Sequence, residues 1–194
     1  MDTTDTADLD QADMARLVAG HDTALDALMA RHAPAVFRFL YRLLGNADDA
    51  NDLAQETFVR LFQHRTGFRS GAKLTPWLYT IAGNLARNQH RWRSRHPNVS
   101  LDAVSAETDP SPGAVLPAAE ASPSEAVMKA ERTRAVRAAV QALPDDLRQA
   151  IVLCEWEDLS LAEAADVLQT TPKAVESRLY RARQLLRQRL SRWL

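Results

Sequence analysis

Apolar residues recur at helical spacing through the first part of the chain. Between residues 25 and 44 they return every three or four positions, which is the period of one face of an amphipathic helix. Pro34 interrupts this stretch, so we expect a kink or a junction there. Gly45-Asn46 follows the last apolar position, and this pair predicts the end of the helix.

A second helix is predicted from about Asn46 to Phe62. Asp48 and Asp49 would lie in its first turn, where carboxylates interact favourably with the positive end of the helix dipole. Opposite its apolar positions, this helix presents a group of acidic and amide side chains, which consists of Asp48, Asp52, Gln55 and Glu56.

A third helix is predicted from Thr75-Pro76, which is typical of an N-cap followed by a proline at the first helical position. We expect it to continue to about Arg95, before Pro97 stops it. One side is apolar, and the other carries Asn84, Arg87, Asn88, Arg91 and Arg95. By itself, such a stripe is as typical of a solvated surface as of a binding face.

The C-terminal part has the signals of two helices joined by a tight turn. Ser160 and Glu163 have the spacing of a capping box, and Thr171-Pro172 repeats the N-cap and proline pattern. This order is typical of a helix-turn-helix motif, whose second helix enters the major groove of DNA. The alternative is a helical hairpin with an arginine-rich, solvated end.

Composition predicts an all-α fold. The chain has 46% hydrophobic residues and only six glycines, and Ala, Leu, Arg and Gln dominate. Residues 102–127 contain four prolines and five acidic residues without any Lys or Arg, which is typical of a flexible acidic linker. We therefore predict two small helical domains, at 17–97 and 124–194, with an acidic tail at 1–16 and a linker at 98–123.

Charge is unevenly distributed, although the formal net charge is only -1. From Thr57 to Leu101 the chain has no Asp or Glu, but it has eight Lys or Arg residues and several aromatic residues. A merely solvated helix usually mixes both signs, because opposite charges four residues apart stabilise it. Cations interleaved with aromatic rings suit phosphates and unstacked bases, so this stretch predicts a nucleic-acid-binding surface.

The sequence lacks the residues that several other classes of protein need. A single cysteine, Cys154, excludes an internal disulfide and a multi-cysteine zinc site. No glycine-rich phosphate loop, metal constellation or nucleophile triad is visible, so we expect no enzymatic activity, cofactor or metal. No signal peptide or membrane-spanning apolar run is visible, so we expect a cytoplasmic protein without membrane insertion.

Five short motifs occur in a fixed order along the chain. They are 52–58, Phe68-Arg69, 77–84, 143–148 and 177–183, with the sequences DLAQETF, FR, WLYTIAGN, LPDDLR and SRLYRAR. From about Leu17 onward the chain resembles extracytoplasmic-function sigma factors, group IV of the sigma-70 family. The resemblance implies a promoter-specificity subunit of RNA polymerase with a sigma2-like and a sigma4-like domain, and an inhibitory anti-sigma factor as a further partner.

The resemblance also implies roles for the acidic face of the second predicted helix and for the basic stretch that follows it. Asp48, Asp52, Gln55 and Glu56 would dock on the clamp helices of the largest polymerase subunit, and the second domain would bind the polymerase flap. The melted -10 element would contact Arg69, Lys73, Trp77, Tyr79, Asn84, Arg87, Asn88, Arg91 and Arg95. If Asn84 reads a base from a short loop, the third helix should break near Gly83.

By the same resemblance, the second helix of the helix-turn-helix would read the -35 element as duplex DNA. The residues implied are Lys173, Glu176, Ser177, Arg178, Arg181 and Arg183. Family members commonly have Gly-Thr-Val followed by Lys or Arg where this chain has residues 173–176, with Glu176 last. Because phosphates repel a carboxylate, Glu176 either accepts from a base donor such as cytosine N4 or lies off the DNA.

Two other classes are compatible with parts of this pattern. A stand-alone helix-turn-helix regulator would bind its operator tightly by itself, whereas a sigma factor should need core polymerase. A phosphohydrolase would use the carboxylates Asp48, Asp49, Asp52 and Glu56, but these also suit a helix start and a docking face. A di-metal bundle would need inward-facing Glu-x-x-His pairs, and none occurs in the sequence.

Overall fold

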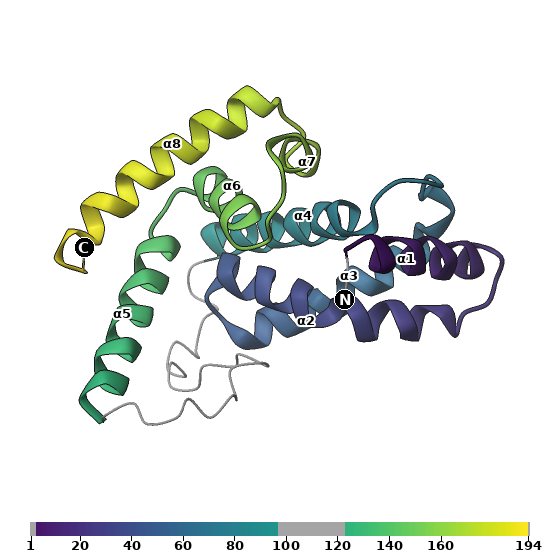
Figure 1. Cartoon of the computed structure of the whole chain (residues 1–194), viewed down its shortest axis with the longest axis horizontal. Coiled ribbons are helices and arrows are strands. Elements are labelled where there is room, and N and C mark those ends of the chain that lie inside the picture. Colours follow the sequence, from purple (N-terminus) through teal and green to yellow (C-terminus); the bar gives the residue numbers. More distant parts are fainter. Residues whose placement is uncertain (1–2, 97–122, 194) are drawn as a thin grey trace.

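Helices make up the structure of this chain, as the composition predicts (Figure 1). The computed structural model describes residues 3–96 and 123–193. Within them, the first domain comprises α1 (Thr3–Val18), α2 (Ala24–Leu44), α3 (Ala47–Gln63), the 3-10 helix η1 (Arg65–Gly67) and α4 (Leu74–Arg95). The second domain comprises α5 (Pro123–Gln141), α6 (Asp145–Glu155), α7 (Leu161–Val167), α8 (Pro172–Arg189) and η2 (Ser191–Trp193). The predicted linker lies outside the described residues except at Pro123.

The predicted boundary between the first two long helices is confirmed. α2 runs through Pro34 as one helix and ends at Gly45, whose φ of 73° is left-handed and whose N–H donates to the carbonyl of Tyr41. Glycine suits this position because a Cβ disfavours a left-handed conformation. Asn46 is the N-cap of α3, and its side chain accepts the N–H of Asp49.

α4 begins two residues earlier than predicted. Its N-cap is Lys73 and its first residue is Leu74, so the prediction of Thr75 as the N-cap is wrong. Pro76 is compatible with this start because the first four N–H groups of a helix have no partner within it. The predicted end at Arg95 is confirmed, and the helix is continuous to that point.

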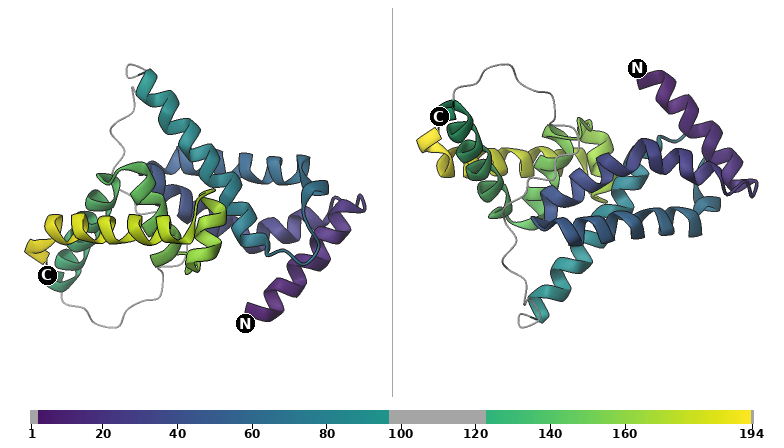
Figure 2. Two further views of the ribbon diagram at one scale, coloured as in Figure 1. Left: turned by 90° about the horizontal axis from the view of Figure 1, so that it is seen from above. Right: turned by 90° about the horizontal axis from the view of Figure 1, so that it is seen from below.

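The acidic stretch near the N-terminus forms α1, which packs against α2 and diverges from it toward the N-terminus (Figure 2). Met14 is buried in the core of the first domain. Asp10 and Asp13 are also buried, and both pair with Arg31 of α2; the distance from Asp13 Oδ2 to Arg31 Nη2 is 2.8 Å. Because buried carboxylates need partners, these residues anchor α1 on α2. The sequence predicts an acidic tail at 1–16, whereas residues 3–16 belong to this packed helix.

The helix-turn-helix of α7 and α8 has the predicted capping residues. Ser160 Oγ accepts the N–H of Glu163, and Glu163 Oε2 accepts the N–H of Ser160 at 3.0 Å. Thr171 Oγ1 accepts the N–H of Ala174 at 3.2 Å, and Pro172 is the first residue of α8. These local bonds satisfy backbone N–H groups that the helices themselves leave without partners.

The two domains pack directly against each other. α7 of the second domain packs against α4, and α6 packs against α2, so α6 and α7 lie over the first domain (Figure 1). At the same contact, the guanidinium of Arg137 on α5 lies over the Tyr41 ring of α2, 4.9 Å from its centre. We use the term interdomain junction for the contact that α2 and α4 make with the second domain.

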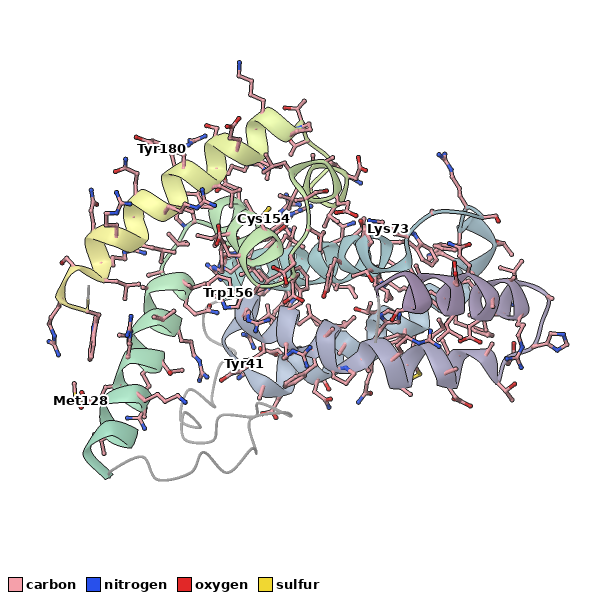
Figure 3. The ribbon with its side chains drawn as sticks, in the orientation of Figure 1. Tyr41, Lys73, Met128, Cys154, Trp156 and Tyr180 are labelled. Atoms are coloured by element: carbon pink, nitrogen blue, oxygen red, sulfur yellow. The ribbon has the colours of Figure 1, made fainter. Side chains whose placement is uncertain are left out.

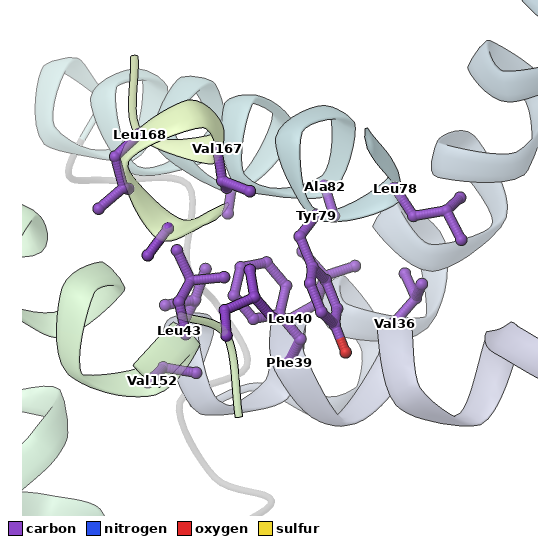
Figure 4. Packing of buried hydrophobic residues seen from close by; sticks show 14 of the residues in the cluster. Val36, Phe39, Leu40, Leu43, Leu78, Tyr79, Ala82, Val152, Val167 and Leu168 are labelled. Carbon is purple, nitrogen blue, oxygen red and sulfur yellow. The ribbon is translucent and has the colours of Figure 1, made fainter. Parts of the chain in front are cut away.

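The centre of the interdomain junction is apolar (Figure 4). Val152 of α6, with Val167 and Leu168 at the end of α7, points toward Leu43 of α2 and Ala82 of α4. All five are buried, so the cores of the two domains are continuous in this structure. Burial of apolar surface from both sides favours the docked arrangement.

No helix within residues 3–96 and 123–193 is both long and apolar enough to span a bilayer.

Candidate nucleic-acid and polymerase interfaces

The predicted polymerase-binding residues lie on α3. Asp48, Asp52 and Gln55 are exposed, whereas Glu56 is half-buried and accepts from Arg60 Nε at 2.8 Å. Val59 is 47% exposed and lies one turn beyond Gln55, so it adds an apolar contact to the acidic face. Sequence analysis missed Val59, because an isolated apolar residue in a helix is usually interpreted as core.

The predicted -10 residues fall into an exposed group that does not contact the second domain, a group at the interdomain junction, and Trp77 and Asn84, which contact neighbours within the first domain. The exposed group comprises Arg69, Asn88, Arg91 and Arg95. The last turns of α4 extend away from the rest of the molecule (Figure 2). Within the described chain, the arginines of this group form no ion pair, so a cationic helix end faces solvent. Such an end suits the phosphates of nucleic acid.

Trp77 supports the loop that precedes α4. It is half-buried, and its ring lies 5.3 Å from the ring of Phe68 with an interplanar angle of 45°. This tilted pair is a favourable aromatic geometry, and it packs the chain just before α4 against the first turn of that helix.

Three predicted -10 residues instead contact the second domain. The Lys73 ammonium lies 2.7 Å from Glu163 Oε1, and Tyr79 Oη donates to Glu157 Oε2 at 2.5 Å. Arg87 Nη2 donates to Gln149 Oε1 at 3.1 Å. In the docked arrangement, these three side chains are therefore engaged with protein, and Tyr79 is buried.

Glu157 is the acceptor for two residues of the first domain. Besides the Tyr79 hydroxyl, it accepts from Arg42 Nη1 at 2.7 Å, and Arg42 lies 5.8 Å from the centre of the Trp156 ring. We call Glu157, Arg42 and Tyr79 the Glu157 cluster. Burial, followed by the charge of Glu157, raises the pKa of Tyr79 well above its usual range, so the hydroxyl stays protonated and donates.

Glu163 is a second carboxylate of the junction. The hydrogen bond from Lys73, and then those from Ser160, lower the pKa of Glu163 from 4.5 to about 2. Because the folded pKa is depressed, this contact contributes to stability fully above about pH 4.5 and loses its contribution as the pH falls through about 2. At neutral pH the Glu163 carboxyl group is therefore ionised.

The second domain also provides hydrogen-bond donors to the end of α2. Gln141 Nε2 donates to the carbonyl of Arg42 at 2.6 Å, and Arg148 Nη1 donates to the carbonyl of Leu43 at 2.6 Å. The last carbonyls of a helix have no partner within it, so these side chains satisfy them. Gln141, Arg148 and Glu157 were not identified from sequence as junction residues, because their roles depend on the docking of the two domains.

Asn84 lies within α4 and not in a loop. The helix is continuous through Gly83, and Asn84 Oδ1 accepts from Arg87 Nη1 at 3.0 Å. The break near Gly83 that the family resemblance implied is therefore wrong for this structure, whereas the continuous helix predicted from the sequence pattern is confirmed. Here the amide of Asn84 orients Arg87 toward Gln149.

Gly83→Ala should stabilise the protein by about 0.5–1 kcal/mol, because alanine costs less backbone entropy than glycine in a helix. The added Cβ would lie 3.9 Å from Phe39 and from Gln149, which is ordinary contact. Urea unfolding would measure the change. Gly45→Ala is the matched control, and its left-handed φ should make it destabilising. A lower unfolding midpoint for Gly83→Ala would contradict a continuous α4.

The predicted -35 residues lie along α8. Lys173, Glu176, Ser177 and Arg181 are exposed. Arg178 is half-buried, with its Nε 3.7 Å from Asp146 Oδ2, and Arg183 Nε donates to Glu155 at 3.1 Å. The first group is directly available to a ligand, whereas the second is held against α6.

Tyr180 is a further exposed residue of α8 that sequence analysis missed as a site residue. Tyr180 is 64% exposed and lies on the outer side of α8 (Figure 3). It follows Ser177 at a spacing of three, so both lie on one face of the helix. Its hydroxyl accepts from Gln184 Nε2 at 2.8 Å. The helical spacing from Ser177 was the available signal.

The fold defines an all-helical protein with a helix-turn-helix domain docked on a helical domain that has a cationic end. Residues 28–96 match the family model for sigma-70 region 2, and residues 133–186 match that for sigma-70 region 4. The chain belongs to the extracytoplasmic-function (ECF) RNA polymerase sigma factors of the sigma-70 family. It directs transcription initiation and is not an enzyme, as the sequence predicted.

Relatives of known function are similar over most of the chain. The ECF RNA polymerase sigma factor SigE of Mycolicibacterium smegmatis is 35% identical over 167 residues, which are 86% of this chain and 62% of SigE. The RNA polymerase sigma-H factor of Pseudomonas aeruginosa is 32% identical over 181 residues, which are 93% of each chain.

Two solved structures share the fold across both domains. CnrH in complex with the cytosolic domain of CnrY matches with a TM-score of 0.68 and 25% identity, covering 94% of this chain and 97% of CnrH. The sigma factor RpoE of Bartonella quintana, in complex with the anti-sigma factor NepR, matches with a TM-score of 0.67 and 25% identity, covering 86% of this chain and 96% of RpoE.

Proposed function

We propose that this sigma factor binds core RNA polymerase through the exposed face of α3 and promoter DNA through two cationic surfaces. The observation that carries the proposal is the segregation of charge on the first domain. The exposed face of α3 has Asp48 and Asp52, whereas the projecting end of α4 has Arg91 and Arg95. An acidic face suits a basic protein partner, and a cationic end suits phosphates.

The -10 element would be bound by α4 and the loop before it. Arg69, Arg91 and Arg95 are exposed and available for phosphates, and Asn88 offers an amide to a base edge. Lys73, Tyr79, Asn84 and Arg87 would join them only after the second domain separates from α4. We infer that the docked arrangement is a form that must open before the full -10 surface is available.

The -35 element would be bound by the exposed face of α8. Lys173, Ser177 and Arg181 lie in its first three turns, the part of a recognition helix that approaches base edges. Arg178 and Arg183 would reach phosphates after leaving Asp146 and Glu155. Glu176 is exposed on the same helix. If Glu176 contacts a base, its carboxylate would favour cytosine, whose N4 amino group donates a hydrogen bond.

We further propose an anti-sigma factor and the polymerase flap as partners. CnrH and Bartonella quintana RpoE were solved with CnrY and with the anti-sigma factor NepR, respectively, and both share the fold of this chain. A protein that acts on promoter DNA with core polymerase would work in the cytoplasm. The flap would bind the second domain.

Run-off transcription with purified core polymerase on a promoter library tests the function. We expect specific initiation only when this protein is added, and the selected promoters would reveal both elements. Tight binding of one operator by the protein alone, without initiation, would instead support a stand-alone helix-turn-helix regulator.

Arg91→Ala should weaken promoter binding by the holoenzyme to a similar extent on all promoter sequences. If Arg91 contacts one phosphate, the slope of log K against log salt concentration should fall by about one unit. Filter binding or fluorescence anisotropy over a salt series measures this slope. Arg132→Ala, an exposed arginine on α5 outside the proposed DNA surfaces, is the matched control. An unchanged slope for Arg91→Ala would contradict the phosphate contact.

A further inference from the structure

The loop between η1 and α4 has a defined turn. The N–H of Ala72 donates to the carbonyl of Arg69 at 3.0 Å, and Gly71 has a φ of 82°. A positive φ at the third residue of a four-residue turn favours glycine. The turn places Arg69 at one end and Lys73 directly after the other, so its shape sets the spacing of two proposed -10 residues.

Gln11 of α1 binds this turn from a position 60 residues earlier in the chain. The N–H of Gly71 donates to Gln11 Oε1 at 3.0 Å, and Gln11 Nε2 donates to the carbonyl of Ala72. One side-chain amide therefore binds a backbone donor and a backbone acceptor on adjacent residues. This use of both ends of the amide fixes the orientation of the turn as well as its position.

Gln11 is itself held firmly. Its neighbour Asp10 and, two residues on, Asp13 pair with Arg31 of α2, and Met14 is buried. These contacts fix one full turn of α1 around Gln11. On the α4 side, Phe68 and Trp77 pack together at the base of the same loop. The loop is therefore held at its base by an aromatic pair and at its turn by Gln11.

We propose that Gln11 is a positioning residue for recognition of the -10 element. It does not contact DNA; it holds residues 69–72 so that Arg69 and Lys73 are presented in a fixed arrangement. A loop that is ordered before binding loses less conformational entropy when DNA arrives. This inference rests on the proposed function, because it takes Arg69 and Lys73 as part of the -10 surface.

The test measures open-complex formation by the holoenzyme on a promoter selected in the run-off experiment. Open complexes are detected by the permanganate reactivity of their unpaired thymines. Gln11→Ala should lower the equilibrium constant for open-complex formation about tenfold, as expected for the loss of two hydrogen bonds. Affinity for core polymerase should be unchanged. Asp8→Ala, an exposed change on the same helix, is the matched control. Gly71→Ala strains the turn without altering α1 and should reproduce the defect.

A double-mutant cycle with Arg69→Ala separates positioning from general stability. If Gln11 acts through Arg69, the effect of Gln11→Ala should shrink in the Arg69→Ala background. An undiminished effect in that background, or normal promoter opening by Gln11→Ala beside a defective Arg69→Ala, would overturn the inference. Normal promoter opening by both Arg69→Ala and Arg91→Ala would instead overturn the proposed -10 surface.

Discussion

Glu157→Leu is expected to shift the protein from the docked to the separated arrangement of its domains. The change leaves the buried Tyr79 hydroxyl without its acceptor and Arg42 without its counter-ion. Breaking a buried charged pair costs about 3–5 kcal/mol, and we expect about 2–3 kcal/mol here because Arg42 is 30% exposed. That free energy corresponds to a shift of roughly 30- to 150-fold in the docking equilibrium.

Small-angle X-ray scattering and hydrogen exchange of α4 would measure this opening. Glu157→Leu should increase the radius of gyration and the exchange of amides on the junction side of α4. Separation should also raise the apparent affinity for promoter fragments in the presence of core polymerase, because a larger fraction of the protein is competent to bind. Glu131→Leu is the matched control, because Glu131 is an exposed carboxylate on α5 of the same domain and lies outside the Glu157 cluster and the proposed DNA surfaces. Equal scattering profiles for the parent and Glu157→Leu would contradict the role of the Glu157 cluster.

Arg148→Ala is expected to destabilise the protein by about 3 kcal/mol, because hydrogen bonds from a buried charge are costly to lose. The Arg148 side chain is 11% exposed and donates to the carbonyls of Leu43 and Leu143 and to Asp145. Burial lowers the pKa of Arg148, but a guanidinium remains charged in proteins. Its removal leaves buried acceptors in both domains without a donor.

Urea unfolding followed by circular dichroism would measure the loss. Arg148→Lys should be intermediate, because an ammonium cannot reproduce the planar, multiply donating geometry of a guanidinium. Arg187→Ala on the exposed side of α8 should change stability by less than about 0.5 kcal/mol and serves as the control. A loss of similar size for both alanine variants would show that Arg148 has no special role at the junction.

The helix boundaries that could be predicted from sequence are those fixed by neighbouring residues. Gly45 with Asn46, Ser160 with Glu163, and Thr171 each act within one turn of the helix that they bound. The start of α4 was misjudged because Thr75-Pro76 has a valid local signal, whereas the helix begins at the buried Leu74. Here packing overrides the local capping preference.

Long-range contacts explain what sequence analysis did not find. The exposed Arg91 and Arg95 could be predicted because spacing and charge place them on one helix face. The burial of Tyr79 and its bond to Glu157 depend on residues 78 positions apart, so no local pattern indicates them. The same limit applies to Gln11 and its contact with Gly71 and Ala72.

The continuous core of the docked domains imposes an order on biosynthesis. Leu43 and Ala82 leave the ribosome well before Val167 and Leu168, which cover them in the finished protein. At 5–20 residues per second, translation of residues 83–167 takes roughly 4 to 17 s. During that interval the apolar face of the nascent first domain is uncovered. Chaperones or another nascent chain can bind this face before the second domain of the same chain has been synthesised.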